Sequence, residues 1–438
     1  MITLTNIDSD FSDKGGHPPL GIGYIASYIK QYGIDDVSIV DKENNPLKAI
    51  KKHNPDMLGF SSTTPDFPNA VRLAKDAKEE LDIPIIIGGQ HITLLKRLPD
   101  SFDVGVIGEG EETMKELTDL YVHDGELKKE KLKDIKGIIF HDNDKLIMTE
   151  PRPLIEPLDK IPFPARDLFN MNEYLSPRKS ITSNKLNRGT HMFTSRGCPF
   201  SCAFCSSSKF WKKIRYNSPE YAVKEITYLK EKYKVDGLLI FDDLFVGNKE
   251  RLKKIVELLD KEKIELEYRC YTRVNFIIDD EVCRLLKRMG VVSVSLGFES
   301  GSQKILNYLN KKTTVRMNEK AIENCKKYGF HIHGCFILGT PTETREDMMM
   351  TLKFIKDNPI IDEIDLTIMT PYPETRIWDY AKQKGLVSDD MDFSILKTQP
   401  KDLSQLILLN DMDTNEFKEL YKMTLAEVNK RSYNISIK

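Results

Sequence analysis

Residues 191–205 read His-Met-Phe-Thr-Ser-Arg-Gly-Cys-Pro-Phe-Ser-Cys-Ala-Phe-Cys, which spaces Cys198, Cys202 and Cys205 as C-x3-C-x2-C. The run Met192–Ser195 before the cysteines is predicted to be a strand. Thiolates are natural ligands of iron–sulfur clusters, and three of them can hold three irons of a [4Fe–4S] cubane and leave the fourth open. A zinc site would need a fourth protein ligand, and none lies at the usual spacing. The stretch therefore predicts a [4Fe–4S] site, and the alternatives are a zinc knuckle or three unrelated buried cysteines.

Outward from this stretch, apolar runs alternate with helix-like segments from His191 onward. The predicted strands are Met192–Ser195, Gly237–Phe241, Tyr268–Thr272, Val292–Phe298, His331–Leu338 and Glu363–Met369. The predicted helices include Pro219–Lys232, Lys249–Leu259, Asp279–Met289, Arg345–Lys356 and Thr414–Asn429. Six strand–helix units indicate a partial (β/α) barrel, whose active face lies at the carboxyl ends of its strands.

The N-terminal part shows the same alternation over residues 1–122. The predicted strands are Ile2–Ile7, Val37–Asp41, Met57–Ser61, Ile85–Gly89 and Val104–Gly108, and the predicted helices are Leu20–Tyr32, Leu47–Lys52, Pro65–Leu81 and Glu111–Val122. This pattern indicates an α/β fold with a parallel, doubly wound sheet. Ligands bind such sheets at the carboxyl ends of the strands.

Four segments follow from these patterns. Residues 1–122 are expected to form the doubly wound domain, 123–189 a hairpin and a proline-rich linker, 190–386 the partial barrel, and 387–438 a helical C-terminal extension. The hairpin is predicted because Gly137–Phe140 and Lys145–Met148 flank a polar turn.

Composition limits the classes of protein that fit. The 438 residues carry a net charge of −2, with 40% hydrophobic and 30% charged residues, which is a globular balance without a basic field for nucleic acid. No run approaches the ~18 apolar residues of a membrane helix, and no secretory signal is visible, so we expect a cytoplasmic location. Seven cysteines are too few for a disulfide scaffold.

The cysteine motif after a first barrel strand resembles the signature of the radical S-adenosylmethionine (SAM) superfamily, over roughly Gly189–Leu386. The resemblance implies that the open iron chelates SAM. It also implies that an electron, from a reductant such as a flavodoxin or ferredoxin, cleaves SAM to a 5′-deoxyadenosyl radical. The expected substrate is a small molecule or a peptide, and no nucleic acid or membrane partner is expected.

The same resemblance implies SAM contacts at several strand ends. The expected contact residues are Phe204 beside the adenine, Asp242 and Asp243 at the methionine amino group, Arg273 at the carboxylate, Glu299 near the ribose or an internal arginine, and Gly339 near the adenine. Three of these residues have structural alternatives: Asp243 as a helix N-cap, Arg273 in an ordinary ion pair and Glu299 in a structural role. The segment around Gly339 departs from the family pattern G-x-I-x-G-x-x-E, because Cys335 and Thr342 occupy its first and last positions.

Three N-terminal segments resemble the cobalamin-binding domain that precedes many radical SAM domains. They are Pro18–Tyr24, Gly88–His91 and Gly108–Thr113, and each lies at a strand-to-helix junction where glycine lets the backbone approach a bulky ligand. The residues implied to contact cobalamin are Ser61, Thr63, Gly88, Gly89, His91, Gly108, Glu109 and Gly110. The motif D-x-H-x-x-G is absent, so neither His17 nor His91 is expected to ligate cobalt. The alternative is a domain that has lost cobalamin and supports the barrel.

Together these resemblances imply a cobalamin-dependent radical SAM enzyme that methylates an unactivated carbon. A radical SAM enzyme of another reaction type, such as ring closure or rearrangement, is the second hypothesis, with cobalamin redox-active or absent. A non-enzymatic iron–sulfur or corrinoid carrier is the third. The sequence does not identify the substrate.

Overall fold

The structure, a computed structural model, describes residues 1–7, 16–175, 188–400 and 402–435 and divides into two units, each with its own parallel sheet. The first unit comprises Met1–Tyr174 together with Asp389–Leu396. The second comprises Leu175–Ser388 and Lys397–Lys438. The first unit therefore takes one short segment from near the C-terminus.

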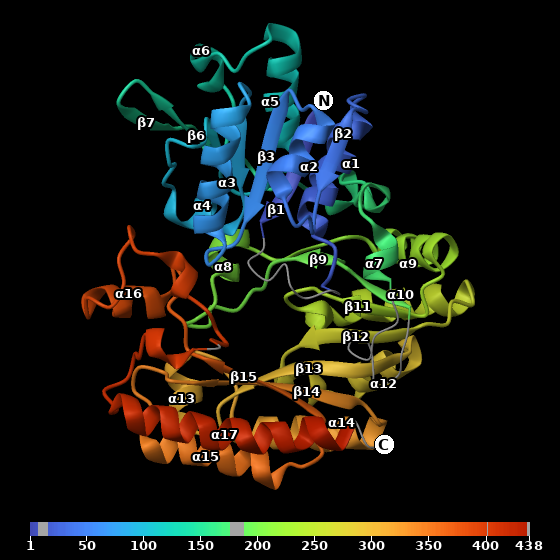
Figure 1. The fold of residues 1–438 in the computed structure, drawn as a ribbon. Helices are drawn as coiled ribbons and strands as arrows, with labels where there is room; N and C mark the ends of the chain where they lie inside the picture. The colour runs from blue at the N-terminus through green and yellow to red at the C-terminus, as the bar shows by residue number, and fades with distance from the viewer. Residues whose placement is uncertain (8–15, 176–187, 401, 436–438) are drawn as a thin grey trace. The chain divides into compact units, whose positions relative to one another are not determined.

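The sheet of the first unit has seven strands in the order β2-β1-β3-β4-β5-β6-β7 (Figure 1). The strands are β1 (Ile2–Ile7), β2 (Val37–Val40), β3 (Met57–Ser62), β4 (Ile85–Gly88), β5 (Val104–Val106), β6 (Ile138–Asp142) and β7 (Lys145–Met148). Strands β1 to β5 are parallel, whereas β6 and β7 form an antiparallel hairpin on β5. The loops that follow β3, β4 and β5 therefore leave the sheet at the same edge.

Helices flank this sheet. They are α1 (Leu20–Gln31), α2 (Pro46–His53), α3 (Phe67–Glu80), α4 (Gln90–Leu95), α5 (Glu111–Asp124), α6 (Lys129–Leu132) and α7 (Met171–Tyr174), with short 3-10 turns η1 (Leu158–Lys160), η2 (Arg166–Leu168) and η4 (Phe393–Ile395). Helix α1 packs beside α5, and α2 packs beside α3. One core cluster joins α2 and α3 to the sheet through fully buried residues such as Ile50, Ala70, Leu58 and Ile87. The expected α/β, doubly wound character is confirmed.

Two features of this unit differ from the expectation. The sequence analysis missed α4, because its six residues follow Gly89 without a helical apolar period. Residues 123–174, which were assigned to the hairpin and linker, lie in the first unit. The hairpin extends the sheet because the apolar, buried start of β6 (Ile138, Ile139 and Phe140) pairs with β5.

The sheet of the second unit has six strands in the order β15-β14-β13-β12-β11-β8, and every neighbouring pair is parallel. The strands are β8 (Gly189–Met192), β11 (Gly237–Ile240), β12 (Glu267–Thr272), β13 (Val291–Glu299), β14 (His331–Leu338) and β15 (Glu363–Ile368). A separate two-stranded pair joins β9 (Ser195–Arg196) to β10 (Arg215–Tyr216). The expected six-stranded partial barrel is confirmed, with one open side.

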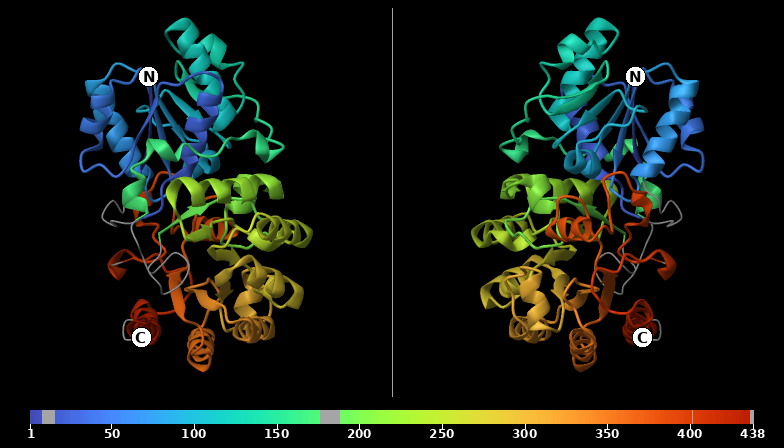
Figure 2. Two further views of the ribbon diagram at one scale, coloured as in Figure 1. Left: turned by 90° about the vertical axis from the view of Figure 1, so that its right-hand side faces the viewer. Right: turned by 90° about the vertical axis from the view of Figure 1, so that its left-hand side faces the viewer.

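Helices alternate with these strands, and the two turned views show them flanking the sheet of this unit (Figure 2). They are α8 (Ser207–Trp211), α9 (Pro219–Tyr233), α10 (Lys249–Lys261), α11 (Val274–Ile277), α12 (Asp280–Met289), α13 (Gln303–Tyr308), α14 (Val315–Tyr328), α15 (Arg345–Asp357), α16 (Arg376–Gln383) and α17 (Thr414–Ile435), with η3 (Phe245–Gly247) and η5 (Leu403–Gln405). Helix α17 packs on α15 and β15, and it is the predicted C-terminal helix.

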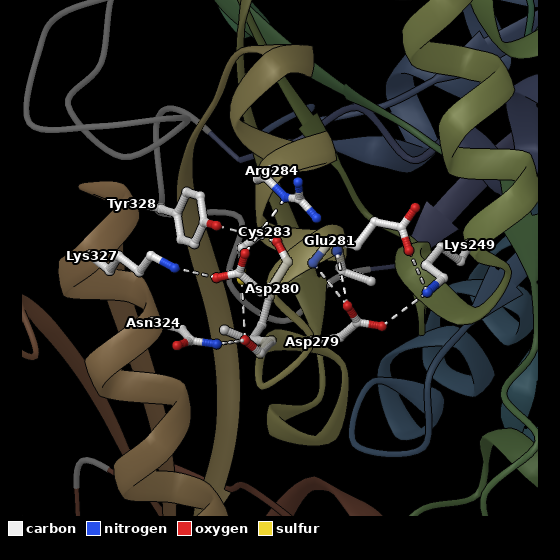
Figure 3. Close-up of polar contacts among 11 residues, drawn as sticks. Lys249, Asp279, Asp280, Glu281, Cys283, Arg284, Asn324, Lys327 and Tyr328 are labelled. Atoms are coloured by element: carbon white, nitrogen blue, oxygen red, sulfur yellow. Dashed lines mark hydrogen bonds and ion pairs between the residues drawn. The ribbon is translucent and has the colours of Figure 1, made fainter.

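Ion pairs join three of these helices at the start of α12 (Figure 3). Asp279 caps α12 by accepting hydrogen bonds from the amides of Glu281 and Val282, and it pairs with Lys249 of α10 at 3.2 Å. On the other side, Asp280 pairs with Lys327 of α14. These contacts connect α12 to α10 and to α14.

The first strand of the barrel differs from its expected position. We expected a strand at Met192–Ser195, but β8 ends at Met192, and Thr194 and Ser195 are hydrogen-bonded to Asp242. That contact turns the chain toward the cysteine loop. Among the described residues, no helix has both the length and the apolar character needed to cross a membrane.

Candidate functional site

The three cysteines lie in one loop after β9, and backbone contacts hold that loop in place. Gly197 begins it with φ of +95°, and a Cβ there would lie 2.5 Å from the carbonyl oxygen of Lys213. Within the loop, the amide of Cys205 donates to the carbonyl of Cys202 at 3.2 Å. The amide of Ala203 donates to the carbonyl of Leu309 at 2.9 Å, which ties the loop to the end of α13. The loop is therefore preorganised by a backbone bond within it and by a bond to the end of α13.

The chemistry of this loop fits an iron–sulfur cluster. Cys198, Cys202 and Cys205 are partly buried, and none of them is in a disulfide. Burial raises the pKa of the Cys205 thiol to about 11, and it raises the pKa of Cys198 as well. Such thiols become thiolates when a metal cation replaces the proton. The loop thus offers three sulfur ligands, and burial favours the protonated thiols of Cys198 and Cys205 when iron is absent.

Arg273, which follows β12, lies against the cysteine loop. Its Nη1 lies 3.2 Å from the sulfur of Cys202, and its guanidinium carbon lies 3.8 Å from the centre of the Phe200 ring. Its Nη2 donates to the carbonyl of Lys311. The structure therefore joins two of the predicted site elements, the cysteine loop and the end of β12. The proposed contact of Arg273 with the SAM carboxylate is therefore additional to its contacts with Cys202, Phe200 and Lys311.

Asp242, after β11, is buried and holds the approach to the cysteine loop. Its carboxylate accepts from the amide and the hydroxyl of Thr194, each at 2.6 Å, and from the hydroxyl of Ser195 at 2.7 Å. Burial raises the pKa of Asp242, and these donors act in the opposite direction. Its contacts are thus with the chain just before the cysteines, so its proposed contact with SAM is additional to this positioning role.

Asp243 connects the two ends of the cysteine segment. Its carboxylate accepts from the hydroxyl of Ser207 at 2.7 Å and from the backbone amide of Gly197. Residues 197 and 207 bracket the three cysteines. The alternative role as a helix N-cap does not apply, because the N-cap residue of η3 is Leu244.

Glu299, at the end of β13, forms a buried ion pair with Lys311. Both side chains are less than a tenth exposed, and Glu299 has φ of +63°. A Cβ at Gly297 would lie 2.6 Å from the Lys311 nitrogen, so glycine is needed to make room for this pair. The same nitrogen lies 6.0 Å from the centre of the half-buried Phe204 ring. The internal cation beside Glu299 is therefore a lysine, which the sequence analysis missed because no motif marks it.

Gly339, after β14, has φ of +89° and donates its amide to Glu343 at 2.5 Å. The amide of Thr340 donates to the same carboxylate oxygen at 3.1 Å. Burial raises the pKa of Glu343 to about 8. The carboxylate expected at the last position of the family pattern thus comes from Glu343, one residue after Thr342. A glutamate placed four residues after the glycine was the signal that could have identified it.

In the first unit, the loops after β3, β4 and β5 lie against one another. Gly89 has φ of +105°, and a Cβ there would lie 2.6 Å from the carbonyl of Ser62. The hydroxyl of Thr93 donates to the carbonyl of Gly89 at 2.8 Å and accepts from the amide of Gly108 at 3.0 Å. Thr93, which the sequence analysis did not single out, therefore joins two of the predicted cobalamin loops.

His91 is buried in an aromatic cluster. Its ring stacks on Phe67 with centroids 3.8 Å apart, and it meets Phe393 in an edge-to-face arrangement with centroids 4.6 Å apart. Burial lowers the pKa of His91 to about 3, so the imidazole is neutral. Phe393 belongs to the C-terminal segment of this unit, which Arg97 also holds through Asp389 at 3.5 Å.

The other predicted cobalamin residues have varied environments. Glu109 is buried and accepts from the amide of Ile155 at 2.9 Å, so it fixes the chain after the hairpin. Thr63 donates to Asp66 at 2.5 Å. Ser61 and Gly88 are partly buried beside each other in the register of β3 and β4, and Gly110 precedes α5.

The edge fits a large polar ligand. Among the described residues, Ser62 Oγ, Thr64 Oγ1 and His91 Nδ1 are buried there without a hydrogen-bond partner in the protein. Buried polar atoms normally have partners, so three of them at or just after the ends of the adjacent strands β3 and β4 are suited to bonds with a ligand or water. A side chain at position 89 would collide with the carbonyl oxygen of Ser62, so glycine is needed there and position 89 places no side chain over this part of the edge. Cobalamin, which carries many amide groups, suits such an edge.

Both units match family models. Residues 12–118 match the B12 binding domain, and residues 192–355 match the Radical SAM superfamily. An uncharacterized methyltransferase of Pyrococcus horikoshii is 37% identical over 382 residues, which cover 84% of this chain and 80% of that protein. The anaerobic magnesium-protoporphyrin IX monomethyl ester cyclase of Rubrivivax gelatinosus is 32% identical over 412 residues, which cover 90% and 72%.

Solved structures share the fold. The cobalamin-dependent SAM radical enzyme OxsB, with aqua-cobalamin bound, matches with a TM-score of 0.69 at 19% identity over 90% of this chain, which spans 56% of OxsB. The radical SAM methyltransferase TsrM from Kitasatospora setae matches with a TM-score of 0.69 at 16% identity, over 89% of this chain and 76% of TsrM. The implied cofactors are a [4Fe–4S] cluster, SAM and cobalamin, and radical SAM enzymes also need an external reductant. The chain therefore belongs to the radical SAM superfamily, among the enzymes that carry a B12-binding domain ahead of the radical SAM domain.

Proposed function

We propose that the chain is a cobalamin-dependent radical SAM methyltransferase that acts on an unactivated carbon. The observation that carries the proposal is the presence, in one chain, of a preorganised three-thiol loop and a glycine-lined sheet edge with unpartnered polar atoms. The similarity to the Pyrococcus methyltransferase supports methyl transfer. When bound, the cluster with SAM supplies a carbon-centred radical that removes hydrogen, and cobalamin supplies the methyl group.

The residues of this chain bind and orient these groups. We propose that Cys198, Cys202 and Cys205 hold the cluster and that Arg273, from its place beside Cys202, orients the carboxylate of SAM. Phe204, Asp242, Asp243, Glu299 and Gly339 are the further proposed SAM residues. The proposed cobalamin residues are Ser61, Thr63, Gly88, Gly89, His91, Gly108, Glu109 and Gly110.

The reductant and the location are part of the proposal. A flavodoxin or ferredoxin would supply the electron, because cleavage of SAM consumes one electron that the described residues do not supply. We propose a cytoplasmic location, since the reducing cytosol keeps the three thiols available for iron.

A second candidate function is ring closure without methyl transfer. The similarity to the Rubrivivax cyclase, at 32% identity, favours it. In that reaction SAM would yield 5′-deoxyadenosine, whereas S-adenosylhomocysteine would not form.

Product analysis separates the two functions. The full chain is reconstituted anaerobically with iron, sulfide and cobalamin, and then given SAM and a reductant. We expect both 5′-deoxyadenosine and S-adenosylhomocysteine. Deoxyadenosine alone would favour the cyclase-type function, and neither product from a protein with an intact cluster would contradict both.

Two variants serve as controls for each other. Changing the three loop cysteines to alanine removes iron and deoxyadenosine and leaves the cobalamin content unchanged. Changing Gly89 to valine places a side chain against Ser62 and lowers the cobalamin content, whereas the iron content stays the same. If the cysteine variant still cleaved SAM reductively, the assignment of the cluster would be wrong.

A further inference from the structure

A second group of potential metal ligands lies on the barrel sheet, away from the cysteine loop in sequence. His333 and Cys335 are two residues apart on β14, so their side chains point to the same face of the sheet. Asp365 on the neighbouring strand β15 is in register with Cys335. The opposite face of β14 carries Phe336, which packs against the aromatic ring of Phe298. The three polar side chains therefore share the face that does not form the aromatic core.

The ligand atoms of these three side chains converge. One ligand atom from each of His333, Cys335 and Asp365 lies within 4.8 Å of the other two. His333 Nε2 and Asp365 Oδ2 are 3.0 Å apart. Zinc binds nitrogen, sulfur and carboxylate ligands at about 2.0–2.3 Å in tetrahedral geometry, so neighbouring ligand atoms lie about 3–4 Å apart. We propose that His333, Cys335 and Asp365 form a zinc site, which does not depend on the proposed methyl transfer.

The contacts behind His333 suit a metal ligand. His333 Nδ1 lies 3.1 Å from the hydroxyl oxygen of Ser295, to which Arg269 also donates at 3.0 Å. With zinc on Nε2, Nδ1 carries the proton and donates to Ser295. Metal-binding histidines usually donate their second ring nitrogen in this way, which fixes the ring and the tautomer. His333 is only 5% exposed, so the ring is held by packing as well.

The charges at the site balance. A thiolate from Cys335 and a carboxylate from Asp365 neutralise the two positive charges of zinc. The neighbouring cation Arg269 is paired with Glu363 at 3.2 Å, which limits its repulsion of a metal. Binding transfers the Cys335 proton to solvent and forms one sulfur–zinc bond, without any change of oxidation state.

The site has the form of an open zinc centre. Three protein ligands leave a fourth position, which structural sites fill with a protein residue and catalytic sites leave to water or substrate. The side chain of Asp365 is 51% exposed, so a ligand can reach the metal from the open side of the sheet. The chemical class that fits the fourth position is a hydroxyl, carboxylate or thiol of a small molecule.

The experiment measures zinc in the holoenzyme. The full chain is reconstituted with its iron–sulfur cluster, equilibrated with zinc, and freed of loosely bound metal. Metal analysis should find one zinc per chain in addition to the iron. X-ray absorption at the zinc edge should show one sulfur and otherwise nitrogen or oxygen ligands. Three sulfurs would place the zinc in the cysteine loop and overturn the proposal, as would the absence of bound zinc.

Variants locate the metal. Cys335→Ser and Asp365→Asn should each weaken zinc binding roughly tenfold or more. Cys283→Ser is the matched control, because the hydroxyl can keep the hydrogen bond that Cys283 donates to the carbonyl of Ile277. Asp365 is half exposed, so its variant tests the site even if Cys335→Ser fails to fold. If both folded variants bound zinc as the wild type does, His333 and Asp365 would form an ion pair only, and the proposal would be wrong.

Discussion

Replacing Glu343 with glutamine removes one ionisable group from the buried turn after β14. The glutamine keeps a side-chain oxygen that can accept from the amides of Gly339 and Thr340, as Glu343 does. Burial raises the pKa of Glu343 to about 8 from an ordinary value of 4.5, although these two amides favour the carboxylate. The variant therefore isolates the effect of ionisation from that of hydrogen bonding.

The magnitude follows from the two pKa values. One pKa unit corresponds to about 1.4 kcal/mol, so the whole difference is about 5 kcal/mol of unfolding free energy. As the pH rises above about 4.5, the unfolded chain loses this proton while the folded protein keeps it. The contribution of Glu343 to stability is thus complete below this pH and is lost as the pH rises through about 8. Between about pH 5.5 and about pH 8.5 the loss is about 3 kcal/mol.

The assay is urea unfolding of the full chain without cofactors, at both pH values, for the wild type and Glu343→Gln. The wild type should lose about 3 kcal/mol more than the variant between the two conditions, because the effects of all other groups cancel in the comparison. Glu346→Gln, at an exposed position on the next turn, should keep the wild-type pH dependence. Equal pH dependence in the wild type and Glu343→Gln, within about 1 kcal/mol, would refute this reasoning.

Three further outcomes are expected. Asp242→Asn should destabilise the second unit by about 2–4 kcal/mol and lower its iron content, because the amide nitrogen that replaces Oδ2 cannot accept from the hydroxyls of Thr194 and Ser195; unchanged unfolding and iron content would contradict this. Lys311→Met should cost about 3–5 kcal/mol by leaving Glu299 buried without its partner, and Glu299→Gln in the same chain should restore part of the loss in urea unfolding. Phe393→Ala should cost about 3–5 kcal/mol in the first unit and lower cobalamin retention, because it opens the packing around His91; a variant with wild-type melting would show that the segment is dispensable.

Much of the fold could be predicted because its signals are local. The boundaries of β1 and β14 agree with the expectation, since each is a run of apolar and β-branched residues bounded by turns. The start of the barrel could not be placed, because the end of β8 depends on hydrogen bonds between Thr194 and Asp242, which lie 48 residues apart. Periodicity does not report such long-range polar contacts.

The candidate site likewise has a part that local sequence could predict and a part that depends on long-range contacts. Cys198, Cys202 and Cys205 could be proposed as cluster ligands from their spacing alone, because a cluster needs several thiolates close together. The partners of the site residues could not be identified. Lys311 reaches Glu299 only because β13 and the chain after α13 come together in three dimensions, and no spacing rule connects them. The loop after β14 did contain its carboxylate, but Glu343 stood one position from the family pattern.

The segment Asp389–Leu396 gives the first unit an unusual order of assembly. Its sheet and helices are synthesised by residue 174, yet the residues that complete it, including Phe393, follow about 220 residues later. At a synthesis rate of roughly 5–20 residues per second, the unit waits roughly 10–45 s on the ribosome for its last piece. A fragment that ends at residue 174 would therefore resemble this nascent intermediate, with His91 lacking one aromatic neighbour. Supplying residues 389–396 as a separate peptide would test whether the unit is completed in trans.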